Sequence, residues 1–283
     1  MGSRAVIITV DDLGQYPETN DAVMSGYDAG VVTSASLRVS GPAAQTAMVS
    51  AGMRPNLGVG LHLVLCDGQS TLPHRHVPNL VDASGCFIER PMEAAWMYRR
   101  RGGLRSELAS EIRAQIEKFL SSGLFLSHIS SHFNLHLQPT VLSIIRELAV
   151  DYPISAIRKP VTKLWRSTQP LSMASWQRFA ERSLIRPVLG WGRLRSGEFL
   201  GPDRVSLLAE NRPVTEDSVA RTLRSAGRGV TEFVSHAGTL RTQYDGVGEF
   251  AAVTSPTVRE AIADADINMI SYRDLAEGAA DAA

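Results

Sequence analysis

The sequence predicts an α/β fold with parallel strands, formed by a single domain that spans residues 1–283. Short apolar, β-branched runs such as residues 5–10 are typical of strands buried on both faces of a parallel sheet. Segments with helical spacing separate these runs, and such alternation favours an α/β architecture. The length also suits one domain, because a (β/α)-type barrel needs roughly 250 residues.

The elements follow from apolar spacing and from Gly and Pro punctuation. We expect strands at 5–10, 31–39, 58–65, 124–129, 156–158, 229–236 and 267–272, and helices at 18–29, 43–51, 104–121 and 141–150. Gly30 ends the first helix, Gly41-Pro42 ends the second strand, and Ser121-Ser122-Gly123 ends the third helix.

Two segments lack a clear pattern. Residues 161–200 carry three tryptophans among many arginines, which fits a basic excursion that covers the site or a plain pair of surface helices. The tail, residues 278–283, is expected to be frayed.

Composition excludes several classes of protein. Lys plus Arg and Asp plus Glu number 29 each, and a chain of zero net charge has no global field for nucleic acid. Cys66 and Cys86 are too few for a disulfide framework or a four-thiolate zinc site. The N-terminus lacks a secretory leader pattern and no apolar run approaches a bilayer span, so we expect a cytoplasmic protein.

Polar side chains gather where predicted strands end: Asp11, Asp12, His62, His132 and His236. The carboxyl ends of parallel barrel strands meet on one face, where active sites form. Aspartate and neutral histidine are suitable ligands for zinc and similar divalent ions. Adjacent aspartates at a strand end are expected to point in different directions, one toward a metal and one toward water. The pattern predicts a metal-assisted hydrolase.

Each signal also has a structural interpretation. An Asp-Asp pair is common in loops, and a lone strand-end histidine such as His62 is often structural. The spacing of His128, His132 and His136 would let one helix stack all three without a metal. The joint placement of the five residues is what favours a site.

Several segments resemble the YdjC/ChbG-like carbohydrate deacetylases. These segments are ITVDDLG (8–14), GVVTSASLRVSGPAA (30–44), VGLHLVLCDG (59–68), LVDASGCF (80–87), ELASEIRAQIEKF (107–119), HISSHFNLHLQPTV (128–141), AIRKP (156–160), TEFVSHAGT (231–239) and ISYRDL (270–275). Four of them, SGPAA, GLHLVLCDG, LVDASG and HLQPTV, look most similar to the hopanoid-biosynthesis deacetylase branch (HpnK). The resemblance implies a (β/α) barrel-like fold related to polysaccharide deacetylases.

The resemblance also implies an activity and a set of roles. Such enzymes remove an acetyl group from an N-acetylated amino sugar by direct attack of metal-activated water, with one divalent ion, here zinc or alternatively magnesium. Matching the motifs makes Asp11 the general base and His236 the general acid or a substrate-binding residue. The expected metal ligands are Asp12, His62 and His132, and the expected substrate contacts are His136 and Arg158. The chain departs from the family pattern at Leu13, Ser130, Phe133, Asn134 and Ala237.

Alternatives for the substrate and the activity stay open. An N-acetylglucosaminyl hopanoid or other glycoconjugate stands beside soluble chitooligosaccharides and antibiotic-type glycosides. A metal-dependent phosphoesterase usually brings two metals and hence more ligands than this chain supplies. A non-catalytic sugar-binding relative should have lost a key residue, and none is lost here.

Residues 94–105 carry an aromatic and apolar cluster that runs into arginines. Trp96, Met97 and Tyr98 could enter a lipid interface while the arginines meet anionic head groups, which predicts peripheral contact with the inner membrane face through Trp96–Arg101. The alternative interpretation is a helix that packs Trp96 into the barrel. A homo-oligomer is a further expectation.

Overall fold

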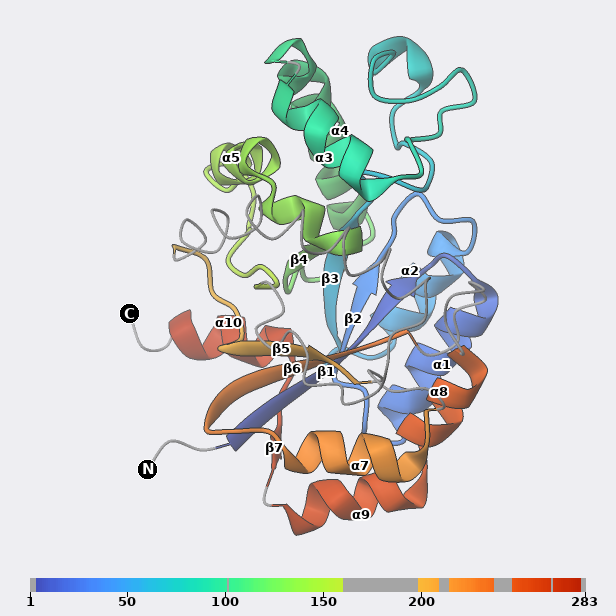
Figure 1. Ribbon diagram of the computed structural model, residues 1–283, viewed down its shortest axis with the longest axis vertical. Helices are drawn as coiled ribbons and strands as arrows, with labels where there is room; N and C mark the ends of the chain where they lie inside the picture. Colours follow the sequence, from blue (N-terminus) through green and yellow to red (C-terminus); the bar gives the residue numbers. More distant parts are fainter. Residues whose placement is uncertain are drawn as a thin grey trace, which may run out of the picture.

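The structure is a computed structural model, which describes residues 4–100, 102–159, 198–208, 214–236, 246–265 and 267–280. In these ranges seven parallel strands form one sheet in the order β4-β3-β2-β1-β6-β5, with β7 also paired to β1 (Figure 1). The strands are β1 (Arg4–Leu13), β2 (Ser34–Leu37), β3 (Gly58–Leu63), β4 (Ile129–Ser131), β5 (Arg204–Leu207), β6 (Gly229–Ser235) and β7 (Asn268–Met269). The prediction of an α/β fold with a parallel sheet is confirmed.

Helices pack around this curled sheet (Figure 1). They are α1 (Pro17–Asp28), α2 (Ala44–Gly52), α3 (Pro91–Arg100), α4 (Arg105–Leu120), α5 (Pro139–Leu148), α7 (Glu216–Arg224), α8 (Gly246–Val253), α9 (Pro256–Asp264) and α10 (Tyr272–Ala280). Three short 3₁₀ helices are η1 (His74–His76), η2 (Gly102–Leu104) and η3 (His132–Leu137). In Figure 1, α3, α4 and α5 lie beside β3 and β4, whereas α7 and α9 pack side by side at the opposite end.

The long strand β1 organises the sheet. Its first half pairs with β7 at Ala5 and Val6, and its second half pairs with β2 from Thr9 onward. Along its other edge it pairs with β6 over seven consecutive residues. Because β1 is central, the residues at its carboxyl end lie in the middle of the sheet's carboxyl edge.

The sheet is curled into a half-barrel between its edge strands β4 and β5. Residues 156–158 continue the curl beyond β4, since Ile157 bridges to Ile129 and Ala156 bridges to Leu200. The strand predicted at 156–158 is therefore present only as isolated bridges, and the one predicted at 124–129 begins later, at Ile129. Arg158 is tied to β4 as well, because its N–H donates to the carbonyl of Ile129 at 2.9 Å.

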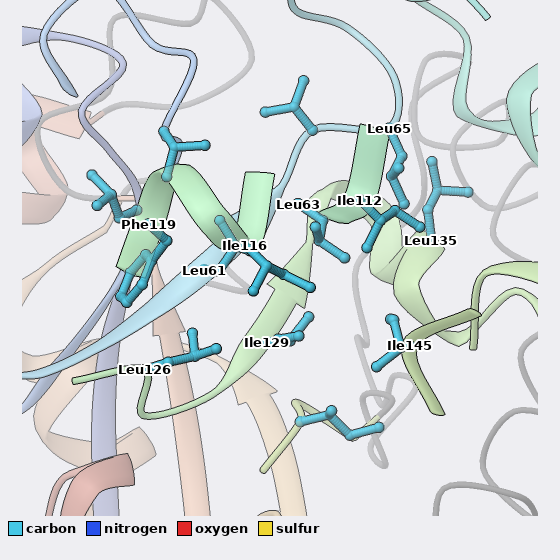
Figure 2. Packing of buried hydrophobic residues seen from close by; sticks show 14 of the residues in the cluster. Leu61, Leu63, Leu65, Ile112, Ile116, Phe119, Leu126, Ile129, Leu135 and Ile145 are labelled. Carbon is cyan, nitrogen blue, oxygen red and sulfur yellow. The ribbon is translucent and has the colours of Figure 1, made fainter. Parts of the chain in front are cut away.

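The larger core lies between β3, β4 and the helices α4 and α5. Figure 2 shows Ile112, Ile116 and Phe119 of α4 beside Leu61 and Leu63 of β3. All five side chains are fully buried. Burying one such side chain contributes about 1.5–3 kcal/mol, so this contact holds β3 firmly in place.

Helix α3 contradicts part of the expected membrane contact. Ala94, Ala95 and Tyr98 form its buried face, and the Tyr98 hydroxyl donates to the carbonyl of Leu65 at 2.5 Å. Tyr98 therefore belongs to the core and cannot enter a lipid interface. Trp96 lies on the outer face with 42% of its surface exposed, and the guanidinium of Arg100 lies over its ring.

Other expectations fall outside the described residues, namely most of the segment 161–200, Arg101, Ala237 and residues 281–283. Helix α10 runs through to Ala280, so the expected fraying at 278 is not seen over its last residues. Within the described ranges, no helix is both long enough and apolar enough to cross a bilayer.

Candidate active site

A β-bulge places both aspartates on one face of the sheet. Val10 pairs with Ala35 and Leu13 with Leu37, so Asp11 and Asp12 together stand opposite a single residue of β2. Asp12 has a left-handed backbone conformation, with φ of 62°. In a regular strand successive side chains point to opposite faces, but such a bulge redirects one of them.

The two aspartates therefore approach the same imidazole. Asp11 Oδ1 lies 3.9 Å from Nδ1 of His62, and Asp12 Oδ1 lies 3.9 Å from Nε2. The two carboxylates lie beside different nitrogens of this ring and pair with different arginines, Asp11 with Arg158 and Asp12 with Arg38. A carboxylate thus flanks each nitrogen of His62.

Asp11 is held by a buried arginine. Arg158 donates from Nη1 to Oδ2 of Asp11 at 2.7 Å and from Nη2 to Oδ1 at 2.8 Å. Burial alone raises the pKa of the Asp11 carboxyl, but the charge and hydrogen bonds of Arg158, together with the nearby imidazoles, outweigh it, and the pKa lies far below its ordinary range. Arg158 also donates from Nε to Glu232 at 3.0 Å, and the hydroxyl of Tyr272 donates to the same carboxylate at 2.7 Å.

This geometry gives Arg158 a different task from the substrate contact expected of it. Its side chain is only 4% exposed, and its donors are directed to Asp11 and Glu232. Arg158 therefore fixes the position and charge of Asp11.

Asp12 is paired with a second buried arginine, Arg38. Nη1 of Arg38 lies 3.3 Å from Oδ1 of Asp12, and Nη2 donates to the carbonyl of Asp67 at 2.7 Å. Burial raises the pKa of the Asp12 carboxyl, but Arg38 and the nearby imidazoles outweigh it, and the pKa lies below its ordinary value. Gly68 makes room for this guanidinium, because a Cβ there would lie 2.4 Å from Nη2.

His62 has one engaged and one unpaired ring nitrogen. Nδ1 lies 3.1 Å from the hydroxyl of Ser130, its register partner on β4, whereas Nε2 is buried without a hydrogen-bond partner. Burial is the main cause that lowers the pKa of His62, to about 4. His62 is therefore neutral at pH 7, and a neutral imidazole nitrogen is the form that binds a metal.

His132 lies at the rim of the same site. Its Nε2 is 4.0 Å from Oδ2 of Asp67, and its charge is among those that lower the pKa of Asp12. It opens η3, where Phe133 and Asn134 both adopt left-handed backbone angles. This break prevents one helix from stacking His128, His132 and His136, so that alternative is wrong.

His136 serves the scaffold. Its Nε2 lies 2.8 Å from the carbonyl of Arg158, its Nδ1 lies 2.8 Å from the Ser131 hydroxyl, and the residue is fully buried. Neither ring nitrogen remains for a substrate, so we reassign His136 from substrate contact to support of the segment that carries Arg158.

His236 follows the last residue of β6, which pairs with Val10 just before the aspartates. Its N–H donates to Oε1 of buried Glu249 at 3.0 Å, and the hydroxyl of Ser235 donates to the same atom at 2.8 Å. Protonated His236 is close enough to contribute to the lowered pKa of Asp11. Glu249 of α8 thus sets the backbone from which His236 projects.

The structure therefore brings Asp11, Asp12 and His62 together, with His132 close enough to act on Asp12 and His236 close enough to act on Asp11. Four further charged residues at this site were not predicted from the sequence: Arg38, Asp67, Glu232 and Glu249. Glu232 and Arg38 did carry a signal, since charged residues inside an apolar strand or at its end are buried only when paired.

The donor set at Asp12 and His62 suits a divalent ion. An unpaired buried nitrogen faces an ionised carboxylate 3.9 Å away, and two atoms bound to one zinc ion lie at most about 4 Å apart. Among the described residues, however, no three His, Cys, Asp or Glu side chains are close enough together to form a complete metal site. Asp12 and His62 fit the ion, and a third side chain would have to approach them to complete the site.

Fold and site together define an α/β protein with carboxylates and imidazoles at the carboxyl edge of a parallel sheet. The chain belongs to the YdjC-like protein family, whose profile matches residues 5–264. It is similar to a carbohydrate deacetylase of Geobacillus stearothermophilus, with 39% identity over 157 residues, which are 55% of this chain and 60% of that protein. It is also similar to a carbohydrate deacetylase of Clostridium beijerinckii, with 26% identity over 95% of this chain and 99% of that one.

The match to the Geobacillus, Brevibacillus brevis and Vibrio campbellii deacetylases spans only 60, 59 and 57% of their lengths. Among solved structures, the chain is similar to an Enterococcus faecalis protein provisionally described as a cellobiose-phosphate cleavage protein. The TM-score is 0.70 at 25% identity, covering 97% of this chain and 99% of the other.

Proposed function

We propose that this protein is a metal-dependent carbohydrate deacetylase, which hydrolyses the N-acetyl group of an amino sugar. The observation that carries the proposal is the convergence of Asp11 and Asp12 on His62, whose Nε2 is buried and unpaired. Membership of the YdjC-like family and the similarity to proteins named carbohydrate deacetylases support the reaction class.

Asp12, His62 and His132 would hold one divalent ion, zinc by preference and magnesium as the alternative. An aspartate and two neutral histidines are a usual zinc set that leaves positions open for other ligands. When bound, such an ion supplies Lewis acidity, which makes water easier to deprotonate and an amide carbonyl easier to attack.

Asp11 is the proposed general base. Arg158 holds both of its oxygens, so the carboxylate is ionised and fixed at the strand end before substrate arrives. It takes the proton of the attacking water at a carboxylate oxygen. Fixing a reacting group in this way reduces the entropy lost on reaching the transition state.

His236 is the proposed general acid. It lies half-buried beside Asp11, on a backbone held by Glu249. In the forward reaction His236 donates its proton to the amine nitrogen as the C–N bond breaks, which leaves a free amino sugar and acetate. An amine is a poor leaving group unless it is protonated, so this transfer is needed for turnover.

For the substrate we propose a lipid-linked amino sugar of the N-acetylglucosaminyl hopanoid type, with soluble chitooligosaccharides as the alternative. The support is the exposed Trp96 with Arg99 and Arg100 on the outer face of α3. An aromatic ring beside arginines suits an anionic membrane surface, where each cation contributes about 1 kcal/mol. The test is cosedimentation with lipid vesicles. We expect the protein to bind anionic but not neutral vesicles, and Trp96→Ala to lose this binding. The exposed Phe125→Ala serves as control.

The test of the reaction compares amphiphilic N-acetylglucosaminides with chitobiose, measuring released acetate and free amine together. We expect both products in equal amounts, from metal-loaded protein only. Faster turnover of chitobiose would leave the deacetylase proposal standing and remove the lipid-linked substrate.

A further inference from the structure

A chain of buried polar side chains runs from His62 away from the site. Nδ1 of His62 lies 3.1 Å from the hydroxyl of Ser130, and this hydroxyl lies 2.9 Å from that of Ser36. Ser36 in turn lies 3.1 Å from Nε2 of His128, whose Nδ1 lies 3.0 Å from the hydroxyl of Ser127. All five residues are buried, so the chain exchanges no bonds with bulk water.

The number of protons on these groups restricts which of them donates and which accepts in each hydrogen bond. A hydroxyl donates one hydrogen bond and accepts two, and a neutral imidazole donates from one nitrogen and accepts at the other. Arg158 can only donate, and its Nη2 reaches Ser36 at 3.5 Å. Ser36 therefore accepts from one of Ser130 and His128 and donates to the other.

Only two arrangements satisfy the chain, and they run in opposite directions. In the first, His62 donates from Nδ1 to Ser130, the bonds run onward to Nε2 of His128, and His128 donates from Nδ1 to Ser127. In the second, every bond is reversed and His62 carries its proton on Nε2. Each group holds one exchangeable proton in both arrangements, so the total charge does not change.

The two arrangements differ in what His62 presents to Asp12. In the first arrangement the N–H of Nδ1 lies 3.9 Å from Oδ1 of Asp11, but Arg158 already donates to both oxygens of that carboxylate at 2.7 and 2.8 Å. The second arrangement points the N–H of Nε2 toward Oδ1 of Asp12, 3.9 Å away, where Arg38 makes one longer contact of 3.3 Å. The second arrangement is therefore favourable without a metal. The first places a lone pair on Nε2, which is the form that a divalent ion requires. A cation at Nε2 therefore selects the first arrangement.

The imidazole ring of His128 is packed too tightly to rotate when the tautomer of His62 changes. It stacks on Tyr272 with ring centroids 3.9 Å apart, and a Cβ at Gly60 would lie 2.3 Å from its ring. Burial is the main reason why the pKa of His128 lies well below its ordinary value, so it stays neutral. A change at His62 thus reaches His128 only as a change of tautomer.

We propose that Ser130 and Ser36 are positioning residues that couple the tautomer of His62 to that of His128, so that a divalent cation at His62 moves the His128 proton from Nε2 to Nδ1. The inference rests on the metal site of the proposed function. It deepens that function, because it names the residues that prepare His62 as a ligand.

The test uses the full chain labelled with 15N-histidine, with and without Zn²⁺, in long-range ¹H–¹⁵N spectra that distinguish protonated from unprotonated ring nitrogens. In the native protein we expect zinc to shift the proton to Nδ1 in both His62 and His128. In Ser36→Ala, His62 still responds and His128 does not, and zinc binds about 10-fold more weakly. Ser130→Ala breaks the other link and should decouple His128 in the same way.

Ser34→Ala is the matched control. Ser34 is buried on the same strand, but its hydroxyl accepts from the N–H of Tyr272 and takes no part in the chain. It should keep the coupled response. A native protein in which His62 responds to zinc and His128 does not would overturn the coupling alone. A His62 that does not respond to zinc would overturn the metal site itself.

Discussion

Arg158 donates hydrogen bonds to both carboxylate oxygens of Asp11, at 2.7 and 2.8 Å, although the two residues are 147 positions apart in the chain. The contact joins the segment after β4 to the carboxyl end of β1. It neutralises a carboxylate that would otherwise be costly to bury, and it fixes the direction from which Asp11 can take a proton.

We expect Arg158→Lys to lower kcat about 100-fold with little change in KM. An ammonium group keeps the charge but cannot make the bidentate pair of hydrogen bonds that positions Asp11. Steady-state rates of acetate release measure the effect. Arg273→Lys, at an exposed pair with Glu277, is the control and should retain native rates. A fully active Arg158→Lys variant would show that the two hydrogen bonds from Arg158 do not position Asp11.

Substitution of the two aspartates should have different effects on metal binding and on turnover. Asp12→Asn is expected to lose divalent metal binding, whereas Asp11→Asn should bind metal normally and lose turnover. The reason is that Asp12 faces the unpaired Nε2 of His62, while Asp11 is occupied by Arg158. Elemental analysis after dialysis, with His132→Ala beside them, measures this. Undiminished metal in Asp12→Asn or His132→Ala would remove that residue from the ligand set.

Glu249→Gln should lower kcat moderately, by about 10-fold, without loss of metal. The amide keeps the shape of the side chain but binds the N–H of His236 and the Ser235 hydroxyl less strongly than a carboxylate does. His236→Ala should cost more, and most with poor leaving amines. A Glu249→Gln change that lowers kcat as much in the His236→Ala background as in the native protein would show that Glu249 does not act through His236.

Acid should destabilise the metal-free protein in a defined window. Burial lowers the pKa of His136 to about 3 and of His62 to about 4, and it lowers that of His128 as well. The unfolded chain, with histidine pKa values of about 6.5, binds more protons below that pH. The free energy of unfolding therefore falls as pH drops from about 6.5 to about 4, by about 1.4 kcal/mol per unit for each neutral histidine.

Urea denaturation in the presence of EDTA across this window measures the slope. His136→Gln removes one titrating group and should reduce the slope by about 1.4 kcal/mol per pH unit. His76→Gln, an exposed position, should leave it unchanged. A flat profile between pH 6.5 and 4 in the native protein would contradict the burial of these neutral rings.

Much of the fold could be predicted because apolar spacing reflects burial directly. Leu104, Leu108, Ile112 and Ile116 are spaced as one helix face, and all four pack in the core. The strand-end positions of Asp11, Asp12 and His62 likewise predict their meeting, since parallel strands share one carboxyl edge.

Other features depend on long-range pairing, which a local pattern does not contain. The bulge at Asp11 and Asp12 arises from the register between β1 and β2, so the approach of both carboxylates to one imidazole was not predictable from their adjacency. The left-handed angles at Phe133 and Asn134 similarly break a regular histidine spacing. The hydrogen-bonding roles of Ser36 and Ser130 were not predictable, because a buried serine in a strand is ordinary until its partners are known.

The most direct test of the account is the stoichiometry of products from an N-acetylglucosaminide incubated with the metal-loaded protein. We predict one acetate and one free amine per turnover, abolished by EDTA, restored by Zn²⁺, and absent from Asp11→Asn even though that variant retains its metal. Acetate release that persists in Asp11→Asn, or that does not depend on metal in the native protein, would contradict the account.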